Sequence, residues 1–82
     1  MISNDFKSAK KVVGLKQATK ALENGKAKAL FLAEDADERV VKPLLELSEK
    51  KQVAVEKVAT MQELGRMCGI QVGAAAVALL AD

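Results

Sequence analysis

Short apolar runs of strand length alternate along this chain with segments whose apolar residues recur at helical spacing, and this alternation constrains the fold most. The clearest runs are residues 29–33 and 74–80, and the clearest helical segment is residues 15–24. Strands and helices that alternate within 82 residues predict one sheet with helices packed on both faces. We therefore predict a single domain, residues 1–82, with an α/β fold: a three-layer α/β/α sandwich around a central four-stranded mixed sheet.

The predicted elements follow the order helix, strand, helix, strand, helix, strand, helix, strand. Their expected positions are residues 3–10, 12–13, 15–24, 29–33, a helix from residue 43, then 53–56, 61–68 and 74–80. Pro43 cannot lie in a helix interior without the loss of a hydrogen bond, so we expect a turn capped by Asp37 and a helix that restarts at Pro43. Thr60 and Glu63 form a capping box for the next helix. The alanine content of residues 74–80 leaves a helix as an alternative for that segment.

The core has to be aliphatic, because the chain contains two phenylalanines and neither tyrosine nor tryptophan. RNA-binding sheets of the RRM type and OB-folds stack bases on exposed aromatic side chains, and Phe6 and Phe31 cannot supply such a surface between them. The sequence also lacks histidine, which excludes Ser-His and Cys-His catalytic pairs and any His-ligated metal. We therefore expect neither base stacking nor an enzyme activity, and no cofactor.

The single cysteine and the length of the apolar stretches indicate the compartment. Cys68 excludes an internal disulfide and a multi-cysteine metal site, which fits a reducing environment. It lies beside Leu64 and Met67 on the apolar side of its helix, so we interpret it as an inert thiol. The longest apolar stretch, residues 72–81, is about half of the ~20 residues that a bilayer span needs, and no signal-peptide region precedes it. We expect a cytoplasmic protein with no membrane association.

The acidic run at residues 34–38 and three glycines are the other candidates for a chemical role. The run has the carboxylate density that hard metal ions prefer, but Asp37 is expected to cap a helix and the loop lacks glycine and asparagine. We predict no metal site there. Gly65, Gly69 and Gly73 match neither a dinucleotide-binding fingerprint nor a P-loop. We interpret Gly65 and Gly69 as residues of helix packing and capping.

The remaining candidate site is a basic segment near the amino terminus. The net charge is only +2, but the first quarter of the chain holds five lysines opposed by Asp5 alone. On a helix that starts near Gly14, Lys16 and Lys20 lie one turn apart and Gln17 lies beside both. Ammonium groups bind phosphates, an amide pairs with a base edge, and a helix N-terminus attracts anions. A helix face that is exposed to solvent and binds nothing has the same pattern, so this is the alternative interpretation.

Two separated segments resemble a known family. They are Gly14-Leu15-Lys16-Gln17-Ala18-Thr19-Lys20 and Leu64-Gly65-Arg66-Met67-Cys68-Gly69-Ile70-Gln71-Val72-Gly73-Ala74-Ala75. Together with the loop at residues 33–37, they resemble the ribosomal protein L-seven-Ae family, in particular its short bacterial members of the YbxF type. The resemblance covers essentially the whole chain. It implies the α/β/α sandwich and the binding of kink-turn RNA, in which a bulge and tandem sheared G·A pairs bend the helix sharply.

The resemblance also implies which residues contact the RNA. The start of the helix at residues 15–24 enters the widened major groove at the G·A pairs, and residues 70–72 pack on unpaired bulge nucleotides. Further phosphate contacts are expected from charge and proximity alone. The expected RNA-binding residues are Gly14, Lys16, Gln17, Lys20, Ile70, Gln71 and Val72, with Arg66, Lys10 and Lys11 as phosphate contacts.

The chain departs from many family members at one pair of residues. Archaeal and eukaryotic members usually have Asn-Glu where this chain has Lys16-Gln17, a pair that is typical of the bacterial subgroup. A glutamate accepts strongly from guanine, whereas Gln17 makes weaker neutral bonds and Lys16 adds nonspecific attraction to phosphate.

We expect a monomer that binds ribosomal or riboswitch RNA, with the ribosome as a further expected partner. The competing hypothesis is a protein-interaction module, because related folds also bind proteins and residues 70–72 are apolar.

Overall fold

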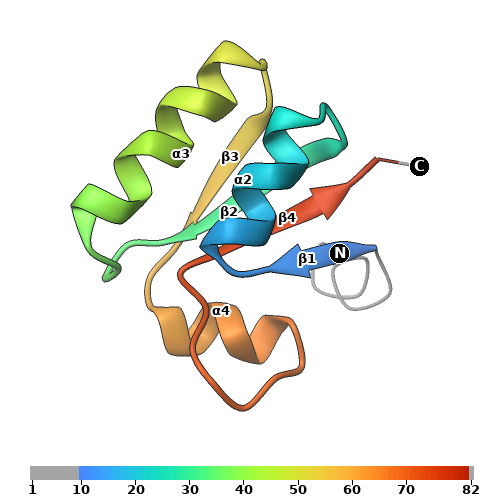
Figure 1. Ribbon diagram of the computed structural model, residues 1–82. Helices are drawn as coiled ribbons and strands as arrows, with labels where there is room; N and C mark the ends of the chain where they lie inside the picture. The colour runs from blue at the N-terminus through green and yellow to red at the C-terminus, as the bar shows by residue number, and fades with distance from the viewer. Residues whose placement is uncertain (1–9, 82) are drawn as a thin grey trace.

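The computed structural model describes residues 10–81, which form a four-stranded sheet with three helices around it (Figure 1). The predicted first helix lies outside these residues except for Lys10. From the first strand onward the predicted order of strands and helices is confirmed. The elements are β1 (Lys11–Val13), α2 (Leu15–Glu23), β2 (Ala27–Ala33), α3 (Glu38–Lys50), β3 (Ala54–Val58), α4 (Met61–Met67) and β4 (Ala76–Leu80).

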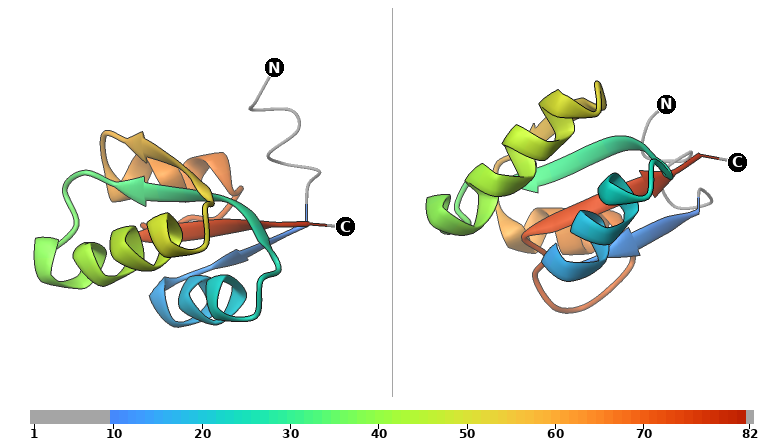
Figure 2. Two further views of the ribbon diagram at one scale, coloured as in Figure 1. Left: turned by 90° about the horizontal axis from the view of Figure 1, so that it is seen from above. Right: turned by 45° about the horizontal axis from the view of Figure 1, so that its top comes forward.

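The sheet is mixed, as predicted, and has the strand order β1-β4-β2-β3. β4 pairs antiparallel with both β1 and β2, whereas β2 and β3 are parallel and are joined by the crossover helix α3. α2 and α3 cover one face of the sheet and α4 covers the other (Figure 2). The three-layer α/β/α prediction is therefore confirmed, and the segment 74–80 is a strand from Ala76 rather than a helix.

Two apolar cores, one on each face of the sheet, hold the layers together. Side chains alternate along β2, so Leu30 and Leu32 pack under α2 and α3 while Phe31 and Ala33 pack against the α4 side. Both sets are buried, which explains why this strand reads as an uninterrupted apolar run in the sequence. Leu64 of α4 has no exposed surface and anchors the smaller core.

The predicted break at Pro43 is wrong, because α3 runs unbroken from Glu38 to Lys50 with Pro43 inside it. Proline removes one N–H, and its ring crowds the carbonyl of the residue four positions earlier, which is Arg39. Both residues are exposed, so water can solvate that carbonyl, while burial of Leu44 on the opposite side holds the helix against the sheet.

Among residues 10–81, no helix has the length and apolar character that a bilayer crossing requires.

Pro43→Ala is expected to stabilise the protein. The substitution restores the missing hydrogen bond and relieves the crowding, effects that together amount to about 3 kcal/mol in a regular helix. The greater freedom of alanine in the unfolded chain offsets about 0.4–1 kcal/mol of this gain. Urea unfolding followed by circular dichroism should show a higher midpoint with an unchanged slope. A lower midpoint would mean that the ring packs against the fold.

The side chains of Asp37 and Thr60 both cap the helices that follow them. Asp37 accepts a hydrogen bond from the Arg39 amide at 2.9 Å, and the Thr60 hydroxyl accepts one from the Glu63 amide at 3.0 Å. The amide and then the guanidinium of Arg39 hold the pKa of Asp37 below its ordinary value. The charged cap therefore stabilises α3 above the ordinary pKa of aspartate, and its contribution is lost as the pH falls through the lowered value.

Candidate nucleic-acid interface

One end of the sheet brings together the two segments that the sequence singled out. The Gly14 amide donates to the Ala76 carbonyl at 2.8 Å, and the Ala33 amide donates to the Ala75 carbonyl at 3.0 Å. The first bond joins the start of α2 to the first residue of β4, and the second joins the end of β2 to the last residue of the α4–β4 loop, residues 69–75. The α2 start, the β2 end and the end of this loop lie at the left of the sheet in Figure 1, and we call this part of the molecule the Gly14 end.

The start of α2 is open to an anion. Gly14 has φ 110° and ψ 155°, a conformation that is essentially restricted to glycine, and no side chain caps the helix. A Cβ atom built at Gly14 would have no protein atom within 4 Å, so the backbone here is accessible. Lys16, Gln17 and Lys20 are exposed on the same helix, and its first turn contains no acidic residue. This turn can therefore bind phosphate through backbone and side chains together.

The α4–β4 loop forms the second part of the Gly14 end. It folds back over α4, where a Cβ atom on Gly65 would collide with the carbonyl oxygen of Val72. The Ile70 amide donates to the Gly65 carbonyl at 3.0 Å, and the Ile70 side chain packs on the smaller core. Val72 is 70% exposed, the most exposed large apolar side chain of the described residues. The loop thus holds an apolar tip in solvent.

The glycine interpretation is confirmed in both cases. Gly65 is buried where the loop crosses α4, and Gly69 follows the helix with φ 78°, the left-handed conformation that ends many helices.

The three expected phosphate contacts do not gather at one place. The Lys10 carbonyl accepts from the Leu80 amide, which puts Lys10 at the far end of β1, about 13 Å of extended chain from Gly14. Lys11 is half-buried within β1. Arg66 is exposed on α4 beside Thr60 and Glu63. Arg66 therefore lies on the helix that precedes the α4–β4 loop, whereas Lys10 lies at the opposite end of the sheet.

Cys68 lies at the end of α4 and packs on the smaller core as a half-buried free thiol. Partial burial raises the pKa of the Cys68 thiol, and the positive charge of Lys11 opposes this rise. A raised pKa leaves less of the reactive thiolate at neutral pH. The predicted placement of Cys68 on the apolar side of its helix is confirmed.

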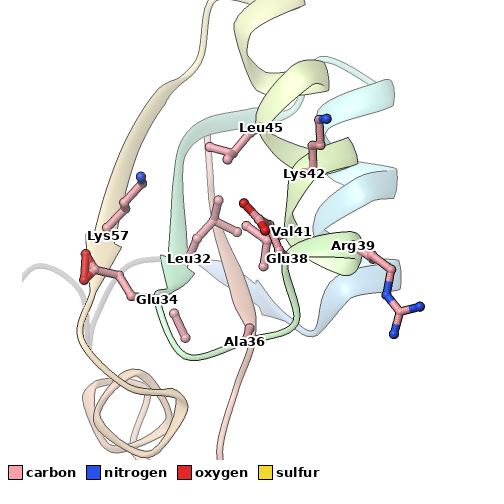
Figure 3. Close-up of a pocket in the computed structure, with 10 residues that line it drawn as sticks. Leu32, Glu34, Ala36, Glu38, Arg39, Val41, Lys42, Leu45 and Lys57 are labelled. Carbon is pink, nitrogen blue, oxygen red and sulfur yellow. The ribbon is translucent and has the colours of Figure 1, made fainter.

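Sequence reasoning missed two features near this end. One is an open hollow of about 850 Å³ between α3 and the ends of β2 and β3 (Figure 3). Its floor contains Leu32, Val41 and Leu45, Glu38 turns toward its centre, and Arg39 points away. The other is Asp35, whose carboxylate accepts from the Met61 amide at 2.8 Å. No local pattern could reveal that bond, because the two residues are 26 positions apart.

Comparison with known proteins assigns the family. The family model described as the Ribosomal protein L7Ae/L30e/S12e/Gadd45 family matches residues 2–82. The chain therefore belongs to this family, which confirms the resemblance seen in the sequence.

Its relatives include several bacterial proteins of similar length. An RNA-binding protein of Caldanaerobacter subterraneus is 51% identical over 69 residues, which are 84% of each chain. RNA-binding protein YbxF of Geobacillus stearothermophilus is 43% identical over 75 residues, 92% of each chain. Large ribosomal subunit protein eL8 of Halobacterium salinarum is 42% identical over 98% of this chain and 66% of its own length.

The fold also matches a solved structure. A Bacillus halodurans protein of unknown function superimposes with a TM-score of 0.80 at 25% identity. The match covers 96% of this chain and 76% of that chain. The arrangement of layers described above is thus found in a related bacterial protein.

Proposed function

We propose that this chain is a noncatalytic RNA-binding protein that recognises kink-turn RNA. The observation that carries the proposal is that the α2 start and the end of the α4–β4 loop lie next to each other at the Gly14 end, because the Gly14 amide donates to Ala76, the residue that directly follows this loop. Membership of the family and the names of the bacterial relatives support RNA as the partner. We place the target in ribosomal or riboswitch RNA, bound by a cytoplasmic monomer.

The chemistry of the Gly14 end suits a bent RNA better than a regular duplex. A regular A-form helix has a deep, narrow major groove that side chains cannot read, so recognition requires that the kink has opened it. The bare backbone at Gly14 then permits close approach, Lys16 and Lys20 attract phosphates, and the Gln17 amide pairs with a base edge. This combination reads both the shape of the backbone and the exposed G·A edges.

The α4–β4 loop supplies apolar contact where other RNA-binding folds use aromatic stacking. Val72 is exposed at its tip, and Ile70 anchors the loop to the core. Unpaired bulge nucleotides present flat, weakly polar faces that such side chains can cover. Two different contacts, one polar and one apolar, would therefore hold the two sides of the kink.

A gel-shift titration tests this function. A kink-turn RNA and the same RNA with its G·A pairs replaced are titrated with the protein at one salt concentration. We expect the kink-turn RNA to bind at least about tenfold more tightly, since each lost base contact costs about 1–3 kcal/mol in comparable complexes. Equal affinity for the two RNAs would contradict kink-turn recognition, even if both were bound.

Lys20→Ala should weaken binding and reduce the slope of log K against log salt by roughly one unit, the effect of one lost phosphate contact. The matched control is Lys26→Ala, because Lys26 is also exposed but lies at the opposite end of the sheet, where its carbonyl accepts from the Ala81 amide. Titrations at several salt concentrations measure both slopes. An unchanged slope for Lys20→Ala would remove Lys20 from the contacts.

A protein-interaction module is the alternative function. The hollow beside α3, with its apolar floor and charged rim, favours it, as does the exposed Val72. Co-purification from a lysate treated with nuclease separates the two functions. A protein partner stays bound after the treatment, whereas an RNA partner is degraded by the nuclease.

A further inference from the structure

Asp35 is an exposed carboxylate that links the loop after β2 to the start of α4. It lies in the β2–α3 loop, residues 34–37, and its Oδ1 accepts from the amide of Met61, the first residue of α4, at 2.8 Å. The start of a helix leaves such amides without partners, so this bond ties the loop to α4 as well as capping it. Thr60 caps the same helix through a different amide, that of Glu63.

Met61 also holds the α4–β4 loop. Its carbonyl accepts from the Ala74 amide at 3.0 Å. A Cβ atom on Gly73 would lie 3.2 Å from the Met61 Cβ, so the loop backbone packs directly on this residue. Met61 therefore connects the two loops. Its N–H donates to Asp35, its carbonyl accepts from the Ala74 amide, and its side chain packs on Gly73.

The charge of Asp35 is unfavourable at a surface that receives RNA. A carboxylate near phosphates repels them, and its loss alone should strengthen RNA binding. A carboxylate at this position thus carries an electrostatic cost that a positioning role would offset. The two effects have opposite signs, which makes them separable by experiment.

We propose that Asp35 is a positioning residue for RNA binding: through Met61 it holds the α4–β4 loop in the orientation that presents Val72. This inference rests on the proposed RNA-binding function, since it assigns the loop as an RNA contact. Two carboxylates of the acidic run then have defined structural roles. Asp37 caps α3, and Asp35 joins the loop before α3 to the start of α4.

The first test is kink-turn affinity in three variants. Asp35→Ala removes the acceptor and the charge, and we expect about fivefold weaker binding, the effect of one lost hydrogen bond. Asp35→Asn keeps an acceptor oxygen without the charge, so its binding should be as tight as wild type or tighter. Thr60→Ala removes the other cap of α4 but leaves the Asp35 bond, and its binding should be close to wild type.

The second test uses amide hydrogen exchange in the free protein and therefore does not depend on the RNA function. The Met61 and Ala74 amides should exchange faster in Asp35→Ala than in wild type, Asp35→Asn or Thr60→Ala. Circular dichroism confirms that each variant is folded.

The outcomes distinguish the inference from the function. If wild type does not prefer kink-turn RNA, the proposed function fails, while the exchange pattern still decides whether Asp35 holds the loop. If wild type prefers kink-turn RNA but Asp35→Ala binds as tightly or more tightly, the positioning role is overturned alone. Equal weakening in Asp35→Ala and Asp35→Asn, or equal weakening in Thr60→Ala, would also overturn it.

Discussion

Gly65→Ala should displace the α4–β4 loop from α4 and strongly reduce the affinity for kink-turn RNA. Alanine is a better helix former than glycine by about 1 kcal/mol, so on helix propensity alone this change within α4 would stabilise the protein. The added methyl group would instead collide with the Val72 carbonyl, which is backbone and cannot rotate away. We expect a net destabilisation of about 1–3 kcal/mol, typical of overpacking, and a loss of RNA affinity of at least about tenfold.

Urea unfolding and RNA titration measure these two effects separately. The matched control is Gln62→Ala, which places alanine at an exposed position of the same helix. It should leave both the stability and the RNA affinity near wild type. A stable Gly65→Ala protein with wild-type affinity would show that the loop does not depend on its close contact with α4.

Gly14→Ala should impair folding and RNA binding together. The φ and ψ of Gly14 lie in a region that other residues avoid, so an alanine there costs about 1–3 kcal/mol of stability or forces the start of α2 to move. Either result displaces the first-turn amides and puts a methyl group where the RNA backbone should approach. We expect the affinity for kink-turn RNA to fall by at least about tenfold.

Gly25→Ala is the control for backbone strain. Gly25 has φ 68°, and an added Cβ atom would likewise meet no protein atom within 4 Å. It lies in the turn after α2, at the opposite end of the sheet. The substitution should cost roughly 1–2 kcal/mol of stability, with RNA affinity near wild type. Equal losses of affinity in the two variants would mean that Gly14 acts only through stability.

The elements that could be predicted are those whose signals are local. α2 follows from the helical spacing of Leu15, Ala18 and Leu22, and the caps at Asp37 and Thr60 depend on amides two or three residues away. The buried strand β2 follows from its apolar run. Once these elements are in place, their alternation leaves few arrangements other than a sheet covered on both faces.

The features that could not be predicted depend on contacts between distant segments. Pro43 argues for a break when only its own helix is considered, but the burial of Leu44 and neighbouring residues against the sheet outweighs the lost hydrogen bond. Asp35 has its partner in a different element.

The position of Lys10 shows the same limit for the candidate site. Lys10 is close to Gly14 in sequence, yet the extended strand between them carries it to the other end of the sheet. The lysines in the first quarter of the chain therefore indicate a local positive charge. Their positions in the sequence do not predict which of them lie on the same surface.

We propose that the Gly14 end is the surface that receives kink-turn RNA. The most direct test is an NMR titration of ¹⁵N-labelled protein with kink-turn RNA, which follows the amides of the whole chain. We expect the largest shifts on residues 14–20 and 70–74, while the amides of Lys26 and Lys51 at the opposite end stay unchanged. Shifts concentrated at that opposite end, or along the hollow beside α3, would contradict it.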